Sequence, residues 1–555
     1  GITALINKYT PTKKTEDLKE YFNISSDDEA ALIVDNELSD YKAKIIDKKI
    51  YVDYKFVHDS LNSRFYWDAN ENVLLYTTAS DIISAAADSN SYSVTKQTND
   101  FGYPIVKATS DSALIALDYV KQYSNITFKS YDDPARIVIT SKWDEIDSAT
   151  VSKSTQVRVK GGIKSPILKE VKKDDKITIL DSGDKWDKVA TEDGVIGYIK
   201  SKALSESKKT KLTNPDYEEE TFTHIKKDKD ICLAWNQVTS QSANNKVPQV
   251  ISSTKGINVM SPTWFYLNDN NGNLADIASK DYVSYCHSQG IEVWGLFSNF
   301  ENTDVDAAYV LTHTSTRTTL INQIMSAAFN YELDGVNIDF ENITEAAYGD
   351  SYIEFIRELA IKCHNNGISL SVDVTVPASF NKFFNRSDMA NFADYIVIMG
   401  YDEHYKGSDA GSVSSIPWVT EGVESTLKEV PADQIILGMP FYTRIWELTP
   451  KEDDDAVTDT EDQSKYTVAS QVYSMDAAAA QLATNNATAA LDEESGQNYA
   501  EWSVSNKLYK VWLEDNTSLE NRLKLVDDNK LAGAAFWKLG FENSSVWDTV
   551  IKYLN

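Results

Sequence analysis

The chain has 555 residues, which is too many for one ordinary hydrophobic core and predicts two to four domains. Hydrophobic residues make up 42% of it and aromatic residues 11%, so we expect packed domains rather than disorder. The net charge of −30 argues against nucleic-acid binding, which needs clustered Lys and Arg. It also argues against simple electrostatic adhesion to an anionic membrane or wall polymer.

The cysteines indicate neither a disulfide framework nor a metal site. Cys232, Cys286 and Cys363 are far apart in apolar segments and show no metal-ligand spacing, so we expect no metal and no cofactor. No run of 18 apolar residues and no signal peptide is visible, which predicts no membrane span in this sequence. Because the chain starts at Gly1 without Met, we expect a trimmed signal or anchor and an extracellular or cell-surface location.

Residues 1–148 alternate short β-like runs with polar turns, which predicts an α+β domain. The stretches 56–78 and 118–141 can be aligned with a one-residue slip. Each is predicted as a short helix, a strand, an acidic turn and a closing strand, which indicates a duplicated unit. The pattern resembles the small repeated domain named after the N-terminus of copper amine oxidases. No copper-ligand spacing accompanies it, since the region holds one histidine, His58.

Residues 154–205 consist of short predicted strands separated by Gly and Asp turns, a pattern typical of a small all-β barrel. The order of Val157-Arg158-Val159, Trp186, Gly194 and Gly197-Tyr198-Ile199 resembles bacterial domains of the Src-homology-3 type. Such domains either bind cell-wall peptides or act as spacers, and both roles stay open. The Lys-rich segment 205–215 then predicts a domain boundary.

From about residue 220 to 555 the pattern becomes strand, loop and helix, repeated. Continuous apolar runs are typical of parallel strands buried on both faces, and eight such runs predict a (β/α)8 TIM barrel of the α/β class. The predicted strands are 230–238, 256–267, 291–300, 333–341, 368–377, 395–404, 434–446 and 531–540. The segment 448–530, which opens with the acidic stretch "KEDDDAVTDTEDQ", is predicted as an insertion before strand eight.

The fourth predicted strand, within "LDGVNIDFEN" (333–342), carries more acids than a buried strand should hold without a use for them. Side chains alternate along a strand, so Asn337, Asp339 and Glu341 share one face, which here is the barrel interior. Chemistry in such barrels gathers at the C-terminal ends of the strands. We therefore predict a polar column at the barrel mouth with Glu341 uppermost.

Other predicted strands bring further candidates to the same end. Strand six ends with Met399, Tyr401 and Asp402, and strand eight carries Trp537. The remaining candidates are Tyr442, Arg444 and Trp446 on strand seven, Trp264 on strand two, and Asp334 at the start of strand four. For Trp264 and Trp446 a place in the core is an equal alternative. For Asp334 the alternative is a turn, because Asp followed by Gly favours one.

These motifs resemble glycoside hydrolase family 18. "DGVNIDFE" is similar to the strand-four motif DxxDxDxE of that family, with Asn337 in place of the second acid. "MGYD", "GMPFYTR" and the Trp of "GAAFWKLG" resemble the family at strands six, seven and eight. The resemblance extends to the bacterial branch with spore-cortex-lytic N-acetylglucosaminidases, through "SPTWFYL", "DEESGQNYAEW" and "YKVWLEDNTSLENRLKLV". That branch also tends to carry Asn at this position.

The resemblance implies a mechanism in which the 2-acetamido oxygen of the substrate is the nucleophile, so that one protein acid is enough. Glu341 would protonate the leaving oxygen, Asp339 would accept a hydrogen bond from the acetamido N–H, and Tyr401 would donate to its oxygen. Asn337 is expected to hydrogen-bond Asp339 without adding charge, and Trp537 to form the floor of the sugar site. The other expected sugar contacts are Asp402, Tyr442, Arg444, Trp446, Trp264 and Asp334.

The predicted function is retaining hydrolysis of a polymer containing N-acetylglucosamine, with peptidoglycan or its fragments as the substrate. A chitinase or an endo-β-N-acetylglucosaminidase would use the same residues. A second class is a non-hydrolytic carbohydrate-binding protein, which the presence of Glu341 disfavours. A third is a surface adhesin or scaffold in which residues 1–205 carry the function.

Overall fold

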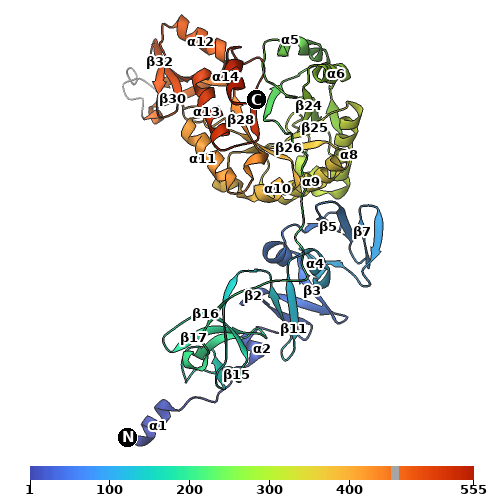
Figure 1. The fold of residues 1–555 in the computed structure, drawn as a ribbon, viewed down its shortest axis with the longest axis vertical. Helices are drawn as coiled ribbons and strands as arrows, with labels where there is room; N and C mark the ends of the chain where they lie inside the picture. Colours follow the sequence, from blue (N-terminus) through green and yellow to red (C-terminus); the bar gives the residue numbers. More distant parts are fainter. Residues whose placement is uncertain (452–461, 555) are drawn as a thin grey trace. The chain divides into compact units, whose positions relative to one another are not determined.

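The computed structural model describes residues 1–451 and 462–554. The chain divides into two compact units, Gly1–Glu220 and Thr221–Asn555 (Figure 1). The predicted acidic stretch at 451–463 lies almost entirely outside the described residues. No helix among the described residues has the length and apolar character that a membrane crossing requires.

The second unit is built on a closed barrel of eight parallel strands, which confirms the predicted TIM barrel. The strands are β20 (Ile231–Asn236), β21 (Val259–Pro262), β24 (Glu292–Ser298), β25 (Gly335–Asp339), β26 (Ser369–Thr375), β27 (Tyr395–Met399), β28 (Ile435–Pro440) and β34 (Gly533–Trp537). Each pairs with the next along the chain, and β34 pairs with β20 to close the barrel. The barrel interior is packed with apolar side chains such as Leu233, Trp294 and Val397.

Helices surround the barrel on its outer side (Figure 1). They include α6 (Lys280–Ser288), α8 (Thr314–Asn330), α9 (Glu345–Asn365), α10 (Arg386–Phe392), α11 (Ile416–Leu427), α13 (Asn516–Asp528) and α14 (Val546–Tyr553). In α13 the side chain of Asp515 caps the first turn by accepting from the backbone N–H of Thr517 and Ser518. The apolar faces of these helices cover the strands from outside, so polar side chains inside the barrel are shielded from water except at its ends.

Two of the runs that were each predicted as one strand contain parts of two separate strands in the structure. The run 256–267 holds β21 and then β22 (Phe265–Leu267), which forms a hairpin with β23 (Leu274–Asp276). The run 434–446 holds β28 and then β29 (Tyr442–Pro450), and β29 leaves the barrel. A continuous apolar sequence does not reveal where one strand ends and the next begins, because both strands bury the same residue types.

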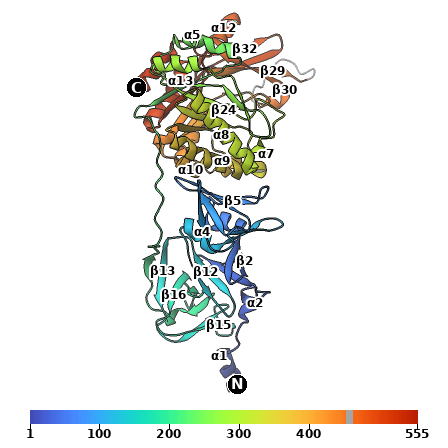
Figure 2. The ribbon, with the colours of Figure 1, turned by 90° about the vertical axis from the view of Figure 1, so that its right-hand side faces the viewer.

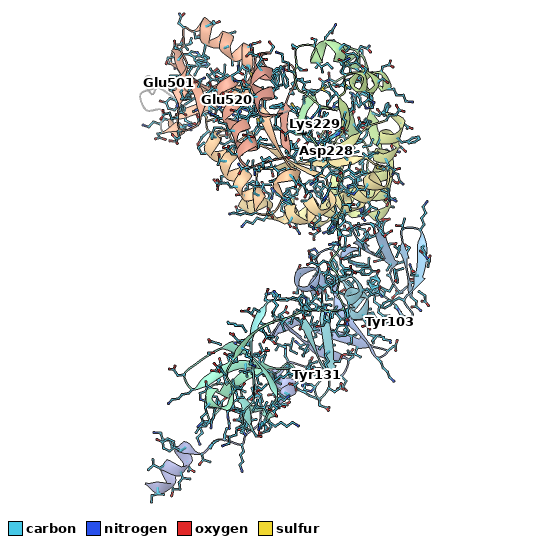
Figure 3. The ribbon with its side chains drawn as sticks, in the orientation of Figure 1. Tyr103, Tyr131, Asp228, Lys229, Glu501 and Glu520 are labelled. Atoms are coloured by element: carbon cyan, nitrogen blue, oxygen red, sulfur yellow. The ribbon has the colours of Figure 1, made fainter. Side chains whose placement is uncertain are left out.

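The insertion before β34 therefore begins at β29. Its antiparallel sheet has the order β30-β29-β33-β32-β31 and is accompanied by the helix α12. Figure 3 labels Glu501 on β32 of this sheet and Glu520 on the neighbouring α13. The elements are β30 (Tyr466–Ser474), α12 (Met475–Thr484), β31 (Ala490–Asp492), β32 (Gln497–Val504) and β33 (Lys507–Trp512). Tyr442, Arg444 and Trp446 are thus on the insertion and not on barrel strand seven, which corrects the prediction.

The first unit holds three sheets, which can be followed in Figure 2. The two aligned stretches share an order of elements: α3 (Tyr54–Phe56) with a turn of π-helix, β4 (Tyr66–Asp68) and β5 (Val73–Thr77), then α4 (Leu117–Tyr123), β11 (Thr127–Tyr131) and β12 (Arg136–Thr140). The two strand pairs belong to different sheets, because β12 also pairs in parallel with β1 (Glu29–Val34).

The strands of residues 154–205 share a core with the preceding sheet. Phe22 and Ile33 pack in one cluster with Val157 and Val189. Gly194, at the turn between β17 (Trp186–Thr191) and β18 (Ile196–Lys200), has φ +88°, and a Cβ there would lie 2.9 Å from Val138 Cγ2. The segments predicted as separate domains are therefore packed as parts of one unit.

A buried ion pair also joins these two parts. Arg136 is 5% exposed, and its Nη2 donates to Asp193 Oδ2 at 2.8 Å.

Arg136→Ala should destabilise the first unit by about 3 kcal/mol, at the low end for a buried pair because Lys169 also contacts Asp193. Hydrogen-exchange mass spectrometry of the full chain should show faster exchange in both 1–148 and 154–205. Lys176→Ala, which breaks the exposed Lys176–Glu192 pair, is the control and should change little. Faster exchange in only one segment would contradict a shared core.

Candidate active site

A cavity of about 500 Å³ opens at the C-terminal ends of the barrel strands. It brings together six of the predicted residues: Asp339, Glu341, Tyr401, Asp402, Tyr442 and Trp537. Its wall also contains Met399 and residues that were not predicted, among them Gln237, Tyr266, Phe300 and Glu301. The candidate site is therefore where the barrel architecture places chemistry.

The backbone of Glu341 is fixed by the end of the neighbouring strand. The backbone N–H of Glu341 donates to Asn299 Oδ1 at 2.8 Å, and Asn299 Nδ2 donates to the Glu341 carbonyl at 2.9 Å. Asn299 directly follows β24 and is buried. These two bonds hold the Glu341 backbone while its carboxyl group lines the cavity.

The Glu341 carboxyl has an environment suited to a general acid. Burial is the main cause that raises its pKa to about 7, and the negative charges of Asp402 and Glu301 add to the effect. A carboxyl with this pKa holds a proton in a large fraction of molecules near neutral pH. This is the property that protonation of a leaving group requires.

Deeper in the barrel than Glu341, Asp339 and Asp373 form a pair of acidic side chains. The pKa of Asp339 is raised well above its usual value by burial first, and then by the charges of Asp373, Glu341 and Glu301. Burial likewise raises the pKa of Asp373, which lies on β26. Two close carboxyls in an apolar setting do not both ionise readily, so the pair tends to retain a proton.

One oxygen of Asp339 has no partner. Its Oδ1 is buried and makes no hydrogen bond within the described part of the chain. A buried polar atom without a partner is costly, and such atoms occur where a ligand supplies the missing bond. Because Asp339 lines the cavity, the missing partner can come from a bound molecule.

Asn337 does not contact Asp339 as predicted. Its Nδ2 donates to Asp373 Oδ1 at 2.7 Å and to Ser371 Oγ at 3.0 Å, and its Oδ1 accepts from Trp235 Nε1 at 3.0 Å and from Ser261 Oγ at 3.3 Å. The prediction of an Asn337–Asp339 bond is therefore wrong. Residues two apart on a strand are separated by about 7 Å, whereas neighbouring strands are about 4.8 Å apart, so the amide contacts β26.

The other predicted residues that line the cavity are aromatic, or in the case of Asp402 accept a hydrogen bond from an aromatic side chain. Tyr401 lies two residues beyond β27, and burial, with the charges of Asp373 and Asp339, raises its pKa well above 10, so its hydroxyl stays a donor. The Tyr442 hydroxyl donates to the Asp402 carboxylate. Trp537 ends β34, and its ring centroid lies 5.9 Å from that of Trp235.

Four predicted sugar contacts lie outside the cavity wall. Asp334 is at the opposite end of β25, where its Oδ2 accepts from His287 Nε2 at 2.7 Å and from the Val293 backbone at 2.8 Å. Trp264 is fully buried and donates to Asn244 Oδ1 at 2.7 Å. Trp446 belongs to the core of the insertion, and Arg444 Nη1 donates to Ser470 Oγ at 3.0 Å. The core alternative for both tryptophans is correct, and Asp334 is a structural residue.

A larger hollow, of about 1370 Å³, lies at the other end of the barrel and includes Asp334, Lys227 and Lys280 in its wall. It contains none of the acids whose pKa is strongly raised. Residues at the N-terminal end of such barrels usually serve stability rather than catalysis, so this hollow is not the candidate site.

Sequence reasoning missed Asp373, Asn299, Glu301 and Trp235. The signal for Asp373 was present, since it is the one acid within the apolar strand "ISLSVDVTVP". Asn299 and Glu301 follow β24 directly, at the end where chemistry gathers. No metal-binding cluster of His, Cys, Asp and Glu occurs in the described ranges.

Comparison with known proteins agrees with this geometry. Residues 297–542 match the family model of glycosyl hydrolases family 18. This part of the chain is similar to family 18 glycosidases. The family 18 match covers β25, with Asp339 at its end, and extends through β34, so it includes the acids and Trp537 of the cavity.

Two curated relatives from Bacillus subtilis (strain 168) are similar to this chain. An uncharacterized glycosylase, YvbX, is 23% identical over 349 residues, which cover 58% of this chain and 95% of the relative. A cortical fragment-lytic enzyme is 24% identical over 287 residues, which cover 50% of this chain and 63% of the relative. Among solved structures, the C-terminal domain of a putative chitinase from Desulfitobacterium hafniense DCB-2 shares the fold. Its TM-score is 0.51 at 18% identity, over 59% of this chain and 98% of that domain.

The raised pKa of Glu341 predicts a pH-dependent gain in stability for Glu341→Gln. Between the usual value of 4.5 and about 7 the folded protein binds more protons at this site than the unfolded chain, so its stability falls as pH rises through that window. Glu341→Gln removes this penalty, which is at most about 3 kcal/mol. Its melting temperature should exceed that of the wild type at pH 8 and match it near pH 4.5. Glu424→Gln, at an exposed site on α11, should leave the melting temperature unchanged at both pH values. A gain that is independent of pH would contradict this origin.

Because Asn337 and Asp373 are hydrogen-bonded directly, we predict that the amide and the carboxyl can be exchanged between the two positions. Asn337→Asp places a second buried carboxyl against Asp373 and should cost about 3 kcal/mol or more. Asp373→Asn removes a negative charge and should lower the pKa of Asp339. In the double variant Asn337→Asp/Asp373→Asn, the carboxylate stands on β25 and the amide on β26. The hydrogen bond between them re-forms, and its donor is now the amide on β26. The double variant should recover most of the stability and hydrolysis lost in Asn337→Asp. Denaturant unfolding and initial rates measure this, and strictly additive effects would contradict direct contact.

Proposed function

We propose that this glycosidase carries out retaining, substrate-assisted hydrolysis of β-linked N-acetylglucosamine polymers, with peptidoglycan or its fragments as the substrate. The observation that supports this most directly is the unpartnered Oδ1 of Asp339 in a cavity that also holds Glu341, whose pKa is raised to about 7. An acetamido N–H is a donor of the kind that this oxygen lacks. A sugar with a 2-acetamido group would present that donor beside its reacting carbon.

In the proposed first step, Glu341 gives its proton to the glycosidic oxygen as the bond from C1 to that oxygen breaks. The carbonyl oxygen of the 2-acetamido group attacks C1 and forms an oxazolinium ion. In the second step water attacks C1, Glu341 takes up a proton from it, and the acetamido group is restored. The two inversions at C1 leave the product with the configuration of the substrate.

The other cavity residues have roles that follow from their surroundings. Asp339 orients the acetamido group through its N–H, and the net negative charge of the Asp339–Asp373 pair stabilises the cation that forms. The Tyr401 hydroxyl, which stays protonated, donates to the acetamido oxygen and holds it on the side from which it attacks. Trp537 supplies an aromatic surface for the C–H face of the sugar ring.

The preference for peptidoglycan has two supports. One similar relative is named a cortical fragment-lytic enzyme, and residues 154–205 resemble bacterial domains that in some proteins bind cell-wall peptides. We also propose that the protein works outside the cell or at its surface, where such a polymer lies. Binding of wall peptide by residues 154–205 stays a prediction, as does the resemblance drawn for residues 1–148.

The first test is product analysis by mass spectrometry, with peptidoglycan glycan strands and chitin oligosaccharides as substrates. The wild type should create new N-acetylglucosamine reducing ends in the peptidoglycan strands. Glu341→Gln keeps the side-chain shape but has no proton to transfer, so its rate should fall by about 10²- to 10⁴-fold. Strands from which the acetyl groups have been removed should resist the wild type, because they lack the internal nucleophile.

The other outcomes decide between the alternatives. Cleavage of chitin oligosaccharides alone would make the enzyme a chitinase. Sugar binding without cleavage of either substrate would favour the non-hydrolytic reading and remove the acid role from Glu341. Equal cleavage of strands with and without acetyl groups would reject the substrate-assisted mechanism, and proton NMR of the first product anomer tests retention independently.

A further inference from the structure

The helix α1 (Ile2–Tyr9) carries an apolar stripe that nothing within the first unit covers. Ile2, Leu5, Ile6 and Tyr9 are 78%, 56%, 59% and 65% exposed. Their spacing of three and four residues places all four on one side of the helix, and Thr3 and Asn7 fall on the other. No residue of α1 is buried, so the helix does not owe its place to packing of this stripe.

The helix is held by its C-terminal end. Lys164 Nζ donates to the carbonyls of Asn7 and Thr10, and Thr12 N–H donates to the Ile163 carbonyl at 2.8 Å. In two views at right angles α1 stands clear of the sheets of the first unit, and Figure 3 shows its side chains with no other element beside them (Figures 1 and 2). The stripe is therefore presented to the surroundings rather than folded back onto the unit.

The charged side chains within residues 1–14 have one sign, and the first acids, Glu16 and Asp17, follow this segment. The chain as a whole has 84 acidic and 54 basic residues, but residues 1–14 contain Lys8, Lys13 and Lys14 and no Asp or Glu. Lys8 Nζ lies 5.7 Å from the centre of the Tyr9 ring, beside the stripe. An apolar helix face with Lys8 beside it and two further lysines in the same segment matches a surface that is negatively charged outside and apolar beneath, which describes an anionic lipid bilayer.

A second copy of the chain fits the stripe less well. Stable protein interfaces bury about 800 Å² on each partner, which one helix of two turns does not supply. Pairing two stripes would also bring two sets of lysines together without an acid in either segment. A lipid surface has neither difficulty, because it needs no matching shape and each lysine near it contributes about 1 kcal/mol.

We propose that residues 1–14 are a lipid-docking segment, in which α1 lies in the interface of an anionic bilayer with Ile2, Leu5, Ile6 and Tyr9 inserted. The segment binds the bilayer surface and does not span it. The net negative charge of the rest of the chain keeps the remainder from adhering, so contact is limited to this end. This role is independent of the proposed hydrolysis, because no residue of the segment lines the cavity.

The test is co-sedimentation of the full chain with vesicles of phosphatidylglycerol and phosphatidylcholine, beside vesicles of phosphatidylcholine alone. The wild type should bind the anionic vesicles at low ionic strength, and binding should weaken as salt is added. Leu5→Gln/Ile6→Gln should weaken binding at least about tenfold through lost apolar burial. Thr3→Gln/Asn7→Gln makes the same change on the opposite face and should bind within about twofold of the wild type. Lys8→Gln/Lys13→Gln/Lys14→Gln should weaken binding about tenfold or more and remove most of the salt dependence.

Three results would overturn the proposal: no binding of the wild type at low ionic strength, equal binding to neutral vesicles, or equal losses in the two Gln pairs. Light scattering after size-exclusion chromatography supplies the remaining arm. A dimer that Leu5→Gln/Ile6→Gln dissociates would assign the stripe to a second copy instead. Hydrolysis of soluble oligosaccharides should be unchanged in all three variants, because no residue of the segment lines the cavity.

Discussion

The Asn337 side chain is the contact on which the catalytic end of the barrel depends. Its four hydrogen bonds reach β20, β21 and β26 from β25, so one buried amide ties four of the eight strands together. The same amide holds the Asp373 carboxyl in place below Asp339. An amide is suited to this position because it satisfies donors and acceptors on several strands without bringing another charge into an apolar interior.

The acids Asp373, Asp339 and Glu341 cost the fold stability but supply the chemistry of the site. Asp373, Asp339 and Glu341 all have pKa values raised mainly by burial, which means that their ionised forms are disfavoured where they stand. The fold tolerates them because the barrel around them is closed and well packed. A site that is open to water would not raise the pKa of Glu341 into the neutral range, and a general acid would then be lacking at neutral pH.

The first unit has a different physical basis. Its parts are joined by a shared apolar core and by the Arg136–Asp193 pair, and it presents an uncovered apolar stripe on α1. Lipid docking through that stripe would place the enzyme beside a membrane, which suits the proposed action on a polymer at the cell surface. The whole-chain charge of −30 conceals this feature, because the three lysines are local to the first 14 residues.

The sequence by itself determined the barrel and the order of its strands, because apolar runs alternating with helices leave few other arrangements. It also determined that Asp339 and Glu341 share a face, because side chains alternate within one strand. Only the tertiary structure decided the contacts between strands: Asn337 with Asp373, Asn299 with Glu341, and the departure of β29 from the barrel. Local patterns carry no information on which distant residue lies 5 Å away. For the same reason Trp264 and Trp446 had two equal readings until the fold placed them in cores, and the pKa of Glu341 followed only once burial, Asp402 and Glu301 were known.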